Sequence, residues 1–339
     1  MFGNISSSTQ IYQRADGSHF QQPLDPNADS SGWTSLALDQ LLDLSSRMPF
    51  CEASEVAKRW GIQTCPAELE RLTAPMASAL QTAVVTRLKD LALQPLAEGP
   101  SRVMTVQIDG VFVLGQPEAG TCVGIEIKSV LIATHNAPSE RTMLAGVFKP
   151  TELEVLVSGL LRAAGVRASD RLIGLSDGAV WIEQLFAALG IEQVIDVFHA
   201  LEYAMVLMTA LGWDEVEQAR ERSLWCRGLV NVADWVMTFA PVVRSKPVKA
   251  EVLVALTYLQ VRAGRMAFLS LSKAGLPIGS GQVEGMNKSV IGSRMKRSGM
   301  HWSRLGASRM GLLRSQVRSV RAVVLPLRVR FEAFPIPQN

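Results

Sequence analysis

Between residues 103 and 195 the chain alternates two kinds of apolar run, and this alternation limits the folds open to it. Runs rich in β-branched residues come first, at 103–113, 122–128 and 130–133, and they predict adjacent antiparallel strands. Helical and strand patterns then alternate, at 151–164, 172–176, 179–189 and 194–195. This order predicts a mixed α/β sheet.

Helical patterns flank the predicted sheet on both sides. From residue 36 to about residue 89, helix, glycine turn and helix (54–62, then 65–72) give the outline of a helix-turn-helix, and a plain three-helix bundle is the alternative. Residues 95–100 are typical of a linker. A second helical stretch runs from 199 to about 272, where Trp213, Trp225 and Trp235 are expected in the core.

Composition sets the broad class of the protein. With 339 residues, 48% hydrophobic and 19% charged, the chain is long enough to bury a sizeable core. It has neither an apolar run of about 18 residues nor an N-terminal export pattern, so we expect a cytoplasmic protein with no membrane partner. The four cysteines stand far apart, which argues against a zinc site or a disulfide framework, and we expect them to be reduced and mostly buried.

Three carboxylates stand out as candidate metal ligands. Asp109 lies on the first predicted strand, Asp177 follows the strand at 172–176, and Glu284 lies on a later helix. Hard oxygen donors of this kind suit Mg²⁺ or Mn²⁺, and two such ions support in-line phosphodiester displacement. The alternative for both aspartates is a turn, because each is followed by glycine.

The glycine-rich run at 275–285 leads directly into the helix of Glu284. Gly279 and Gly281 permit positive φ and a close approach of the backbone, while Ser280 between them is expected to cap the helix. Free N–H groups at this helix start favour an anion, which we expect to be a DNA phosphate.

Basic residues follow the helix without any acid. From Lys288 to Arg330 there are eleven Lys or Arg and no Asp or Glu, a pattern that favours phosphate binding over the alternative of a solvated helix face. Helical spacing places Arg314, Arg318 and Arg321 on one face. For Trp302, stacking on a base competes with simple packing. The residues predicted to contact DNA are Lys288, Arg294, Lys296, Arg297, Trp302, Arg314 and Arg318.

Three segments carry a family resemblance. Gly-Leu-Pro-Ile-Gly-Ser-Gly-Gln-Val-Glu-Gly (275–285), Lys-Arg-Ser-Gly-Met-His-Trp-Ser (296–303) and Leu-Ser-Asp-Gly-Ala-Val-Trp-Ile (175–182) resemble the ISKra group of bacterial insertion-sequence transposases. The resemblance runs from about residue 40 to residue 320. It implies a DDE transposase whose RNase H-like catalytic domain is interrupted by an all-helical insertion. The catalytic acids would be Asp109, Asp177 and Glu284.

A fourth segment is similar to an element of Mutator-like relatives. Asp196-Val197-Phe198-His199 matches their Asp-x-x-His. The resemblance gives His199 an accessory role, contacting or orienting DNA near the scissile phosphate. The alternative is an ordinary residue at a helix start.

Together these patterns predict a transposase that cleaves element ends and joins the 3′ hydroxyl to target DNA by two-metal catalysis. It would act on double-stranded DNA as a homo-oligomer, associated with the nucleoid. The alternatives are an RNase H-like nuclease without strand transfer and a non-catalytic DNA-binding protein. The expected organisation is a polar tail without stable structure (1–33), a helix-turn-helix-like domain (34–94), the first part of the RNase H-like core (101–200), the helical insertion (201–274), the Glu helix with basic helices (275–325) and a final tail (326–339).

Overall fold

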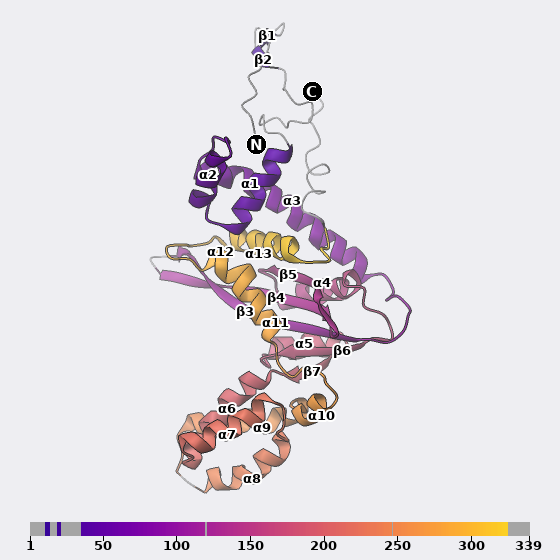
Figure 1. Cartoon of the computed structure of the whole chain (residues 1–339), viewed down its shortest axis with the longest axis vertical. Helices are drawn as coiled ribbons and strands as arrows, with labels where there is room; N and C mark the ends of the chain where they lie inside the picture. Colours follow the sequence, from indigo (N-terminus) through magenta and orange to yellow (C-terminus); the bar gives the residue numbers. More distant parts are fainter. Residues whose placement is uncertain (1–10, 14–18, 22–34, 119–120, 246, 325–339) are drawn as a thin grey trace.

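The computed structural model describes residues 11–13, 19–21, 35–118, 121–245 and 247–324. A five-stranded sheet occupies the middle of the molecule, with α1–α3 and α13 towards one end and α6–α10 at the other (Figure 1). The prediction of a mixed α/β fold is confirmed. Within the described residues, no helix is both long and apolar enough to span a membrane.

The central sheet has the strand order β5-β4-β3-β6-β7. β4 pairs antiparallel with β3 and β5, whereas β6 lies parallel to β3 and β7. The runs at 122–128 and 130–133 form one strand rather than two, and β5 is missing from the predicted set because its first half is polar and exposed. The strands are β3 (Val103–Glu118), β4 (Thr121–Thr134), β5 (Ala137–Gly146), β6 (Arg171–Ser176) and β7 (Glu192–Ile195).

Helices α1 to α5 pack around one hydrophobic core with the sheet. The N-terminal helices contact one another, and the long α3 continues along α4 and α13, so Leu88 of α3 and Leu160 of α4 are fully buried in the same cluster as Ile108 of β3. The helical block expected at 34–94 is therefore joined to the sheet by a continuous core. These helices are α1 (Ser35–Arg47), α2 (Phe50–Arg59), α3 (Pro66–Ala92), α4 (Pro150–Ala163) and α5 (Val180–Ala188).

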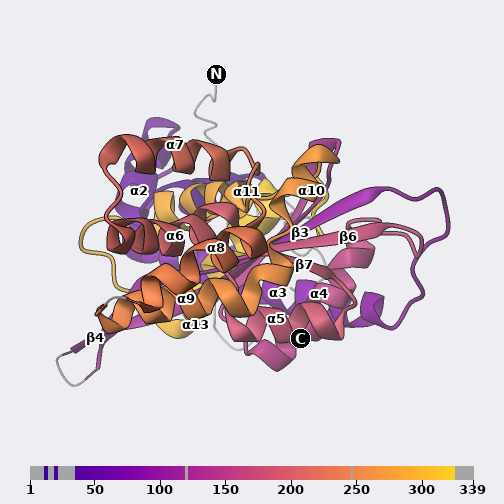
Figure 2. The same ribbon diagram turned by 90° about the horizontal axis from the view of Figure 1, so that it is seen from below.

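The predicted helical insertion forms a second core on β6 and β7. Trp225 and Trp235 are buried there, as expected, in the same cluster as Leu175 and Ile195 of the sheet. Figure 2 shows α6, α7, α8 and α9 gathered together at this end of the molecule. The elements are α6 (Val197–Leu211), α7 (Glu215–Cys226), α8 (Val232–Arg244), α9 (Ala250–Arg262), the short 3₁₀ helix η1 (Ala263–Arg265) and α10 (Phe268–Lys273).

After the insertion the chain returns to the sheet. It forms α11 (Gly281–Met286), the π-helical turn η2 (Asn287–Gly292), α12 (Ser293–Met295) and α13 (Arg304–Arg318). Near the N-terminus, β1 (Ile11–Gln13) pairs antiparallel with β2 (His19–Gln21). The rest of the predicted tail at 1–33, and the tail at 326–339, lie outside the described residues.

Expectations about the cysteines were partly wrong. Cys51, Cys65 and Cys226 are free thiols, but all three are exposed rather than buried. Cys51 and Cys65 lie at or next to the starts of α2 and α3, and Cys226 is the last residue of α7, so each sits near a helix terminus at the surface. The side chain of Cys122 is not described.

Two arginines of the basic tract that the sequence predicts to contact DNA are buried, and they donate hydrogen bonds within the protein. Arg294 and Arg314 are each 2% exposed. Arg314 donates hydrogen bonds to the carbonyl oxygens of Ser46 and Val290 and, at 2.6 Å, to that of Ser289, while Arg294 Nε donates to Ser45 O at 3.0 Å.

These bonds explain why the arginines are inside. Ser45 and Ser46 belong to the last turn of α1, where carbonyls lack helical partners and the helix dipole favours a cation. Burial lowers the pKa of Arg294 and of Arg314 to about 10, which leaves both guanidinium groups charged at neutral pH. Both side chains therefore join α1 to the C-terminal helices.

Replacing Arg314 by Met should lower the free energy of unfolding by about 3 kcal/mol or more, because several buried carbonyls lose their donor. Chemical denaturation with urea measures this change. Arg318→Met removes an exposed cation one turn later on α13 and should stay within about 0.5 kcal/mol. A stable Arg314→Met protein that has lost DNA affinity would show instead that Arg314 contacts DNA.

Candidate active site

Strand register brings Asp109 and Asp177 together. The parallel pairing of β3 with β6 ends at Gln107 and Leu175, and each aspartate lies two residues beyond its member of that pair. Because side chains alternate along a strand, Asp109 points to the same face as Gln107. Both carboxylates therefore lie at the carboxyl end of the parallel strands. The turn after Asp177 requires glycine, since Gly178 has φ +83°.

Three polar contacts hold α11, which carries Glu284, against β3 (Figure 1). Gln107 Oε1 accepts a hydrogen bond from the Val283 N–H at 3.1 Å, and Gln107 Nε2 donates to Gln282 Oε1 at 2.9 Å. One turn further on, Asn287 Nδ2 donates to Asp109 Oδ2 at 2.7 Å. These contacts fix the helix beside the first aspartate.

The three predicted acids line a single cavity of about 220 Å³. Asp109 and Asp177 are half-buried, while the Glu284 side chain is 48% exposed and lies 3.9 Å from Lys288 Nζ. Asp196 and Glu202 add two further carboxylates, and none of the residues that line the cavity is Lys or Arg. The remaining lining residues are Ile108, Phe198, His199 and Ser280.

Like charges therefore face one another in the cavity. Burial raises the pKa of Asp109 above its usual value, and the carboxylates of Asp177 and Glu284 raise it further. Hydrogen bonds from the Gly110 N–H and from Asn287 oppose this shift. Such a cluster favours a cation that neutralises it.

The donor chemistry fits Mg²⁺ or Mn²⁺. All three acids offer hard oxygens, and Asn287 Oδ1 beside them is buried with no hydrogen-bond partner among the described residues. Within the same residues, however, no group of three or more His, Cys, Asp or Glu side chains is arranged to hold a metal ion. The three acids therefore share a cavity without forming a ready-made ligand set among the described residues.

The anion at the glycine-rich loop is a carboxylate of the chain itself, in place of the DNA phosphate that the sequence analysis expects. Asp196 is 3% exposed, and its Oδ2 accepts hydrogen bonds from the Ser280 N–H at 2.5 Å and the Ser280 hydroxyl at 2.8 Å. Its Oδ1 accepts from the His199 N–H at 2.9 Å. Asp196 thus caps α6 and at the same time holds the loop before α11.

Two further expectations for this loop were wrong. The Ser280 hydroxyl donates to Asp196 instead of capping α11. Gly279 and Gly281 do not have positive φ. A close approach does not explain Gly279 either, because an added Cβ would lie at ordinary van der Waals distances, 3.4 Å from the Phe198 ring and 3.6 Å from Asp196 Oδ2.

His199 lies at the edge of the cavity. Its ring is 3.5 Å from Glu202 Oε2 and meets the rings of Tyr203 and Tyr258 edge-on. Tyr258, from α9, donates its hydroxyl to the carbonyl oxygen of Asp177 at 2.7 Å. The insertion thereby reaches the turn that carries the second predicted acid.

Sequence reasoning did not assign a positioning role to the four residues that hold the acids in place, namely Gln107, Asp196, Tyr258 and Asn287, although it named Asp196 as part of the Asp-x-x-His element. Periodicity offered a signal for two of them. Gln107 shares a strand face with Asp109, and Asn287 lies three residues after Glu284 on the same helical surface. The other two contacts depend on tertiary structure, because Tyr258 and Asp196 meet partners that are 81 and 84 residues away.

The remaining predicted DNA contacts differ in accessibility. Lys288, Lys296, Arg297 and Arg318 are exposed, while Trp302 is half-buried with its Nε1 donating to Met295 O at 3.0 Å. The tract lacks acids in sequence but not in space, because Arg297 pairs with Glu52 at 2.6 Å and Arg321 with Glu140 at 2.6 Å. Arg321 lies beyond the end of α13, so the predicted helix face of three arginines does not form.

No protein-family model matches this chain, and a comparison with curated proteins finds no match either.

Replacing Asp196 by Ala should lower the free energy of unfolding by about 2–4 kcal/mol, because two buried donors and one partly buried donor lose their acceptor. Asp214→Ala is a matched control, since Asp214 caps α7 in the same way but at the surface, and it should cost about 1 kcal/mol. Urea denaturation of both variants measures the difference. Equal losses would show that the link from Asp196 to Ser280 contributes nothing.

Proposed function

We propose that this protein is a DDE transposase of the ISKra type. The observation that carries the proposal is the cavity in which Asp109, Asp177 and Glu284 meet without a Lys or Arg among the lining residues. These acids come from β3, the end of β6 and α11, and they are the three to which the resemblance assigns catalysis.

The layout of the chain supports an RNase H-like core with an insertion. The acids lie at the carboxyl end of a parallel strand pair in a mixed sheet, and helices α6–α10 stand between β7 and α11. This is the order that the resemblance implies, with the helical block placed before the final Glu.

The residues divide into two groups by task. Asp109, Asp177 and Glu284 would hold two Mg²⁺ or Mn²⁺ ions, which activate the attacking oxygen and stabilise the leaving one when bound. His199 has an accessory role at the edge of the cavity. Double-stranded DNA, as element ends and target, would be held by the exposed bases Lys288, Lys296, Arg297 and Arg318. We expect a homo-oligomer on DNA in the nucleoid.

Two other functions use the same features. An RNase H-like nuclease would cut DNA with the three acids and never join strands. A non-catalytic DNA-binding protein would use the exposed bases alone. Strand transfer separates the first from a transposase, and metal-dependent cleavage separates the second.

Asp109→Ala or Glu284→Ala should reduce Mg²⁺-dependent cleavage and joining by more than about a hundredfold, because a metal ligand is lost. DNA affinity should change little. The substrate is the DNA that flanks the gene, and cut and joined products are resolved on gels.

Glu215→Ala is the control, since Glu215 is an exposed acid of α7 that does not line the cavity, and this variant should keep its activity. A wild-type protein that binds these ends and never cleaves them would establish the non-catalytic alternative. Cleavage without joined products would establish the nuclease.

A further inference from the structure

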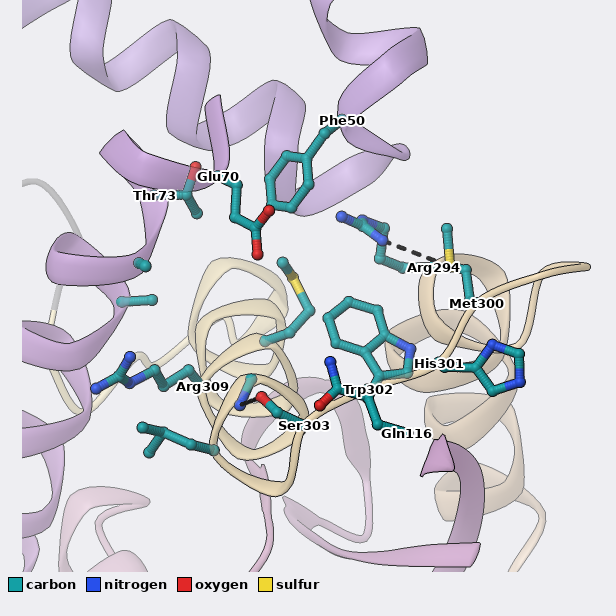
Figure 3. Close-up of a pocket in the computed structure, with 15 residues that line it drawn as sticks. Phe50, Glu70, Thr73, Gln116, Arg294, Met300, His301, Trp302, Ser303 and Arg309 are labelled. Carbon is teal, nitrogen blue, oxygen red and sulfur yellow. Dashed lines mark hydrogen bonds between the residues drawn. The ribbon is translucent and has the colours of Figure 1, made fainter. Parts of the chain in front are cut away.

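A second cavity, of about 380 Å³, lies apart from the acidic one. It is bounded by α2, α3, the outer part of β3, the loop before α13 and the start of α13 (Figure 3). The two cavities share no lining residue. Gln116 of its wall is seven residues beyond Asp109 on β3, which separates the two by about 20 Å along the strand. The volume is in the range of small-ligand sites.

Aromatic rings and a buried cation form one wall. The Arg294 guanidinium lies 5.2 Å from the centroid of the Phe50 ring and 5.3 Å from that of Trp302. The indole is held in place by its hydrogen bond to Met295 O. Figure 3 shows Phe50, Trp302 and Arg294 on the same side of the cavity, with the sulfur of Met300 next to Arg294. This wall is a rigid surface suited to a planar ring.

The cations of this cavity lack anionic partners. No carboxylate lies within ion-pair distance of Arg294 or Arg309 in the part of the chain that the structure describes. Arg309 Nη2 donates to Ser78 Oγ at 3.0 Å, but its Nε is buried with no partner among the same residues. Buried cations are usually paired, so the unpaired guanidinium of the buried Arg294, together with that of the half-buried Arg309, indicates an anionic ligand at this wall.

An acid faces this wall from α3. Glu70 is exposed to the cavity and makes no hydrogen bond or ion pair with other described residues. Figure 3 shows its carboxylate beside the Phe50 ring, directed towards the middle of the cavity. A carboxylate in this position accepts N–H groups, such as those on the edge of a nucleobase.

We propose that this cavity binds one nucleotide, with the base against Phe50 and Trp302, the base edge on Glu70 and the phosphate near Arg294 and Arg309. A planar ring, N–H donors and a negative charge in one ligand match the three kinds of group on the walls. The nucleotide comes either from a DNA strand, as an extruded base, or from solution. The strand source rests on the proposed DNA binding, whereas the solution source does not.

Two probes test the site: dAMP, and a single-stranded oligonucleotide that contains one 2-aminopurine. Stacking on the indole should quench the 2-aminopurine emission on binding, and dAMP should compete if the source is solution. Glu70→Gln should weaken binding of the favoured probe by about tenfold, as expected for a lost charge-assisted hydrogen bond. Trp302→Leu should weaken it by a similar factor, about tenfold, through lost stacking.

Two control variants make the same kinds of substitution at residues outside the cavity. Glu55→Gln removes an exposed acid of α2, and Trp60→Leu removes an indole that is 41% exposed, and neither should alter affinity. Glu70 has no hydrogen-bond or ion-pair partner among the described residues, so its variant should retain the wild-type melting temperature. Binding that is insensitive to Glu70→Gln and Trp302→Leu, or displacement of dAMP by inorganic phosphate at equal concentration, would overturn the proposal.

Failure of the nucleotide-site proposal can be distinguished from failure of the proposed function. A protein that cleaves DNA in Mg²⁺ but binds neither probe here contradicts the nucleotide site alone. A protein that binds a probe through Glu70 and never cleaves DNA contradicts the transposase proposal alone.

Discussion

The docking of α11 on β3 is the contact on which the candidate active site depends. Gln107 uses both ends of its amide on α11, and Asn287 closes the helix onto Asp109. Because Gln107 and Asp109 share one face of the strand, the same two side chains that bind the helix also set its position relative to the first acid. Glu284 is brought to the cavity by contacts made on either side of it.

The helical insertion supports the site through β6 and β7, on the other side of it from α11. Its core packs on Leu175 and Ile195, at the ends of the strands that lead into Asp177 and Asp196. Tyr258 then holds the Asp177 carbonyl, and the Arg262 guanidinium lies 4.5 Å from the Tyr258 ring centroid while its Nε lies 3.2 Å from Glu183 of α5. An added Cβ on Gly178 would fall 3.0 Å from the Tyr258 hydroxyl, so the turn and the insertion fit closely. The insertion is therefore part of the support for the acidic cavity.

Sequence reasoning succeeded where local pattern and burial coincide. The strands around Asp109 and Asp177 are apolar and β-branched, so their existence followed from composition, and their register then placed the acids together. It failed for β5, whose exposed first half has no apolar signal. It also failed for the glycine-rich loop, where the anion was expected from outside but is Asp196, 84 residues earlier in the chain. A pattern along the sequence does not show which distant side chain will satisfy a buried N–H.

The basic tract shows why charge in sequence differs from charge at a surface. Arg294 and Arg314 belong to a run of sequence without acids, yet both guanidinium groups donate hydrogen bonds to carbonyl oxygens at the end of α1. The last carbonyls of a helix have no intrahelical donor and need another one when they are buried. A guanidinium group can donate to several of them at once. Arg314 donates in this way to the carbonyl oxygens of Ser46, Ser289 and Val290. Arg294 gives only Nε to α1, and the rest of its guanidinium remains on the wall of the second cavity. Two arginines of the same basic tract thus differ in role, because they differ in the number of backbone carbonyls to which each one donates.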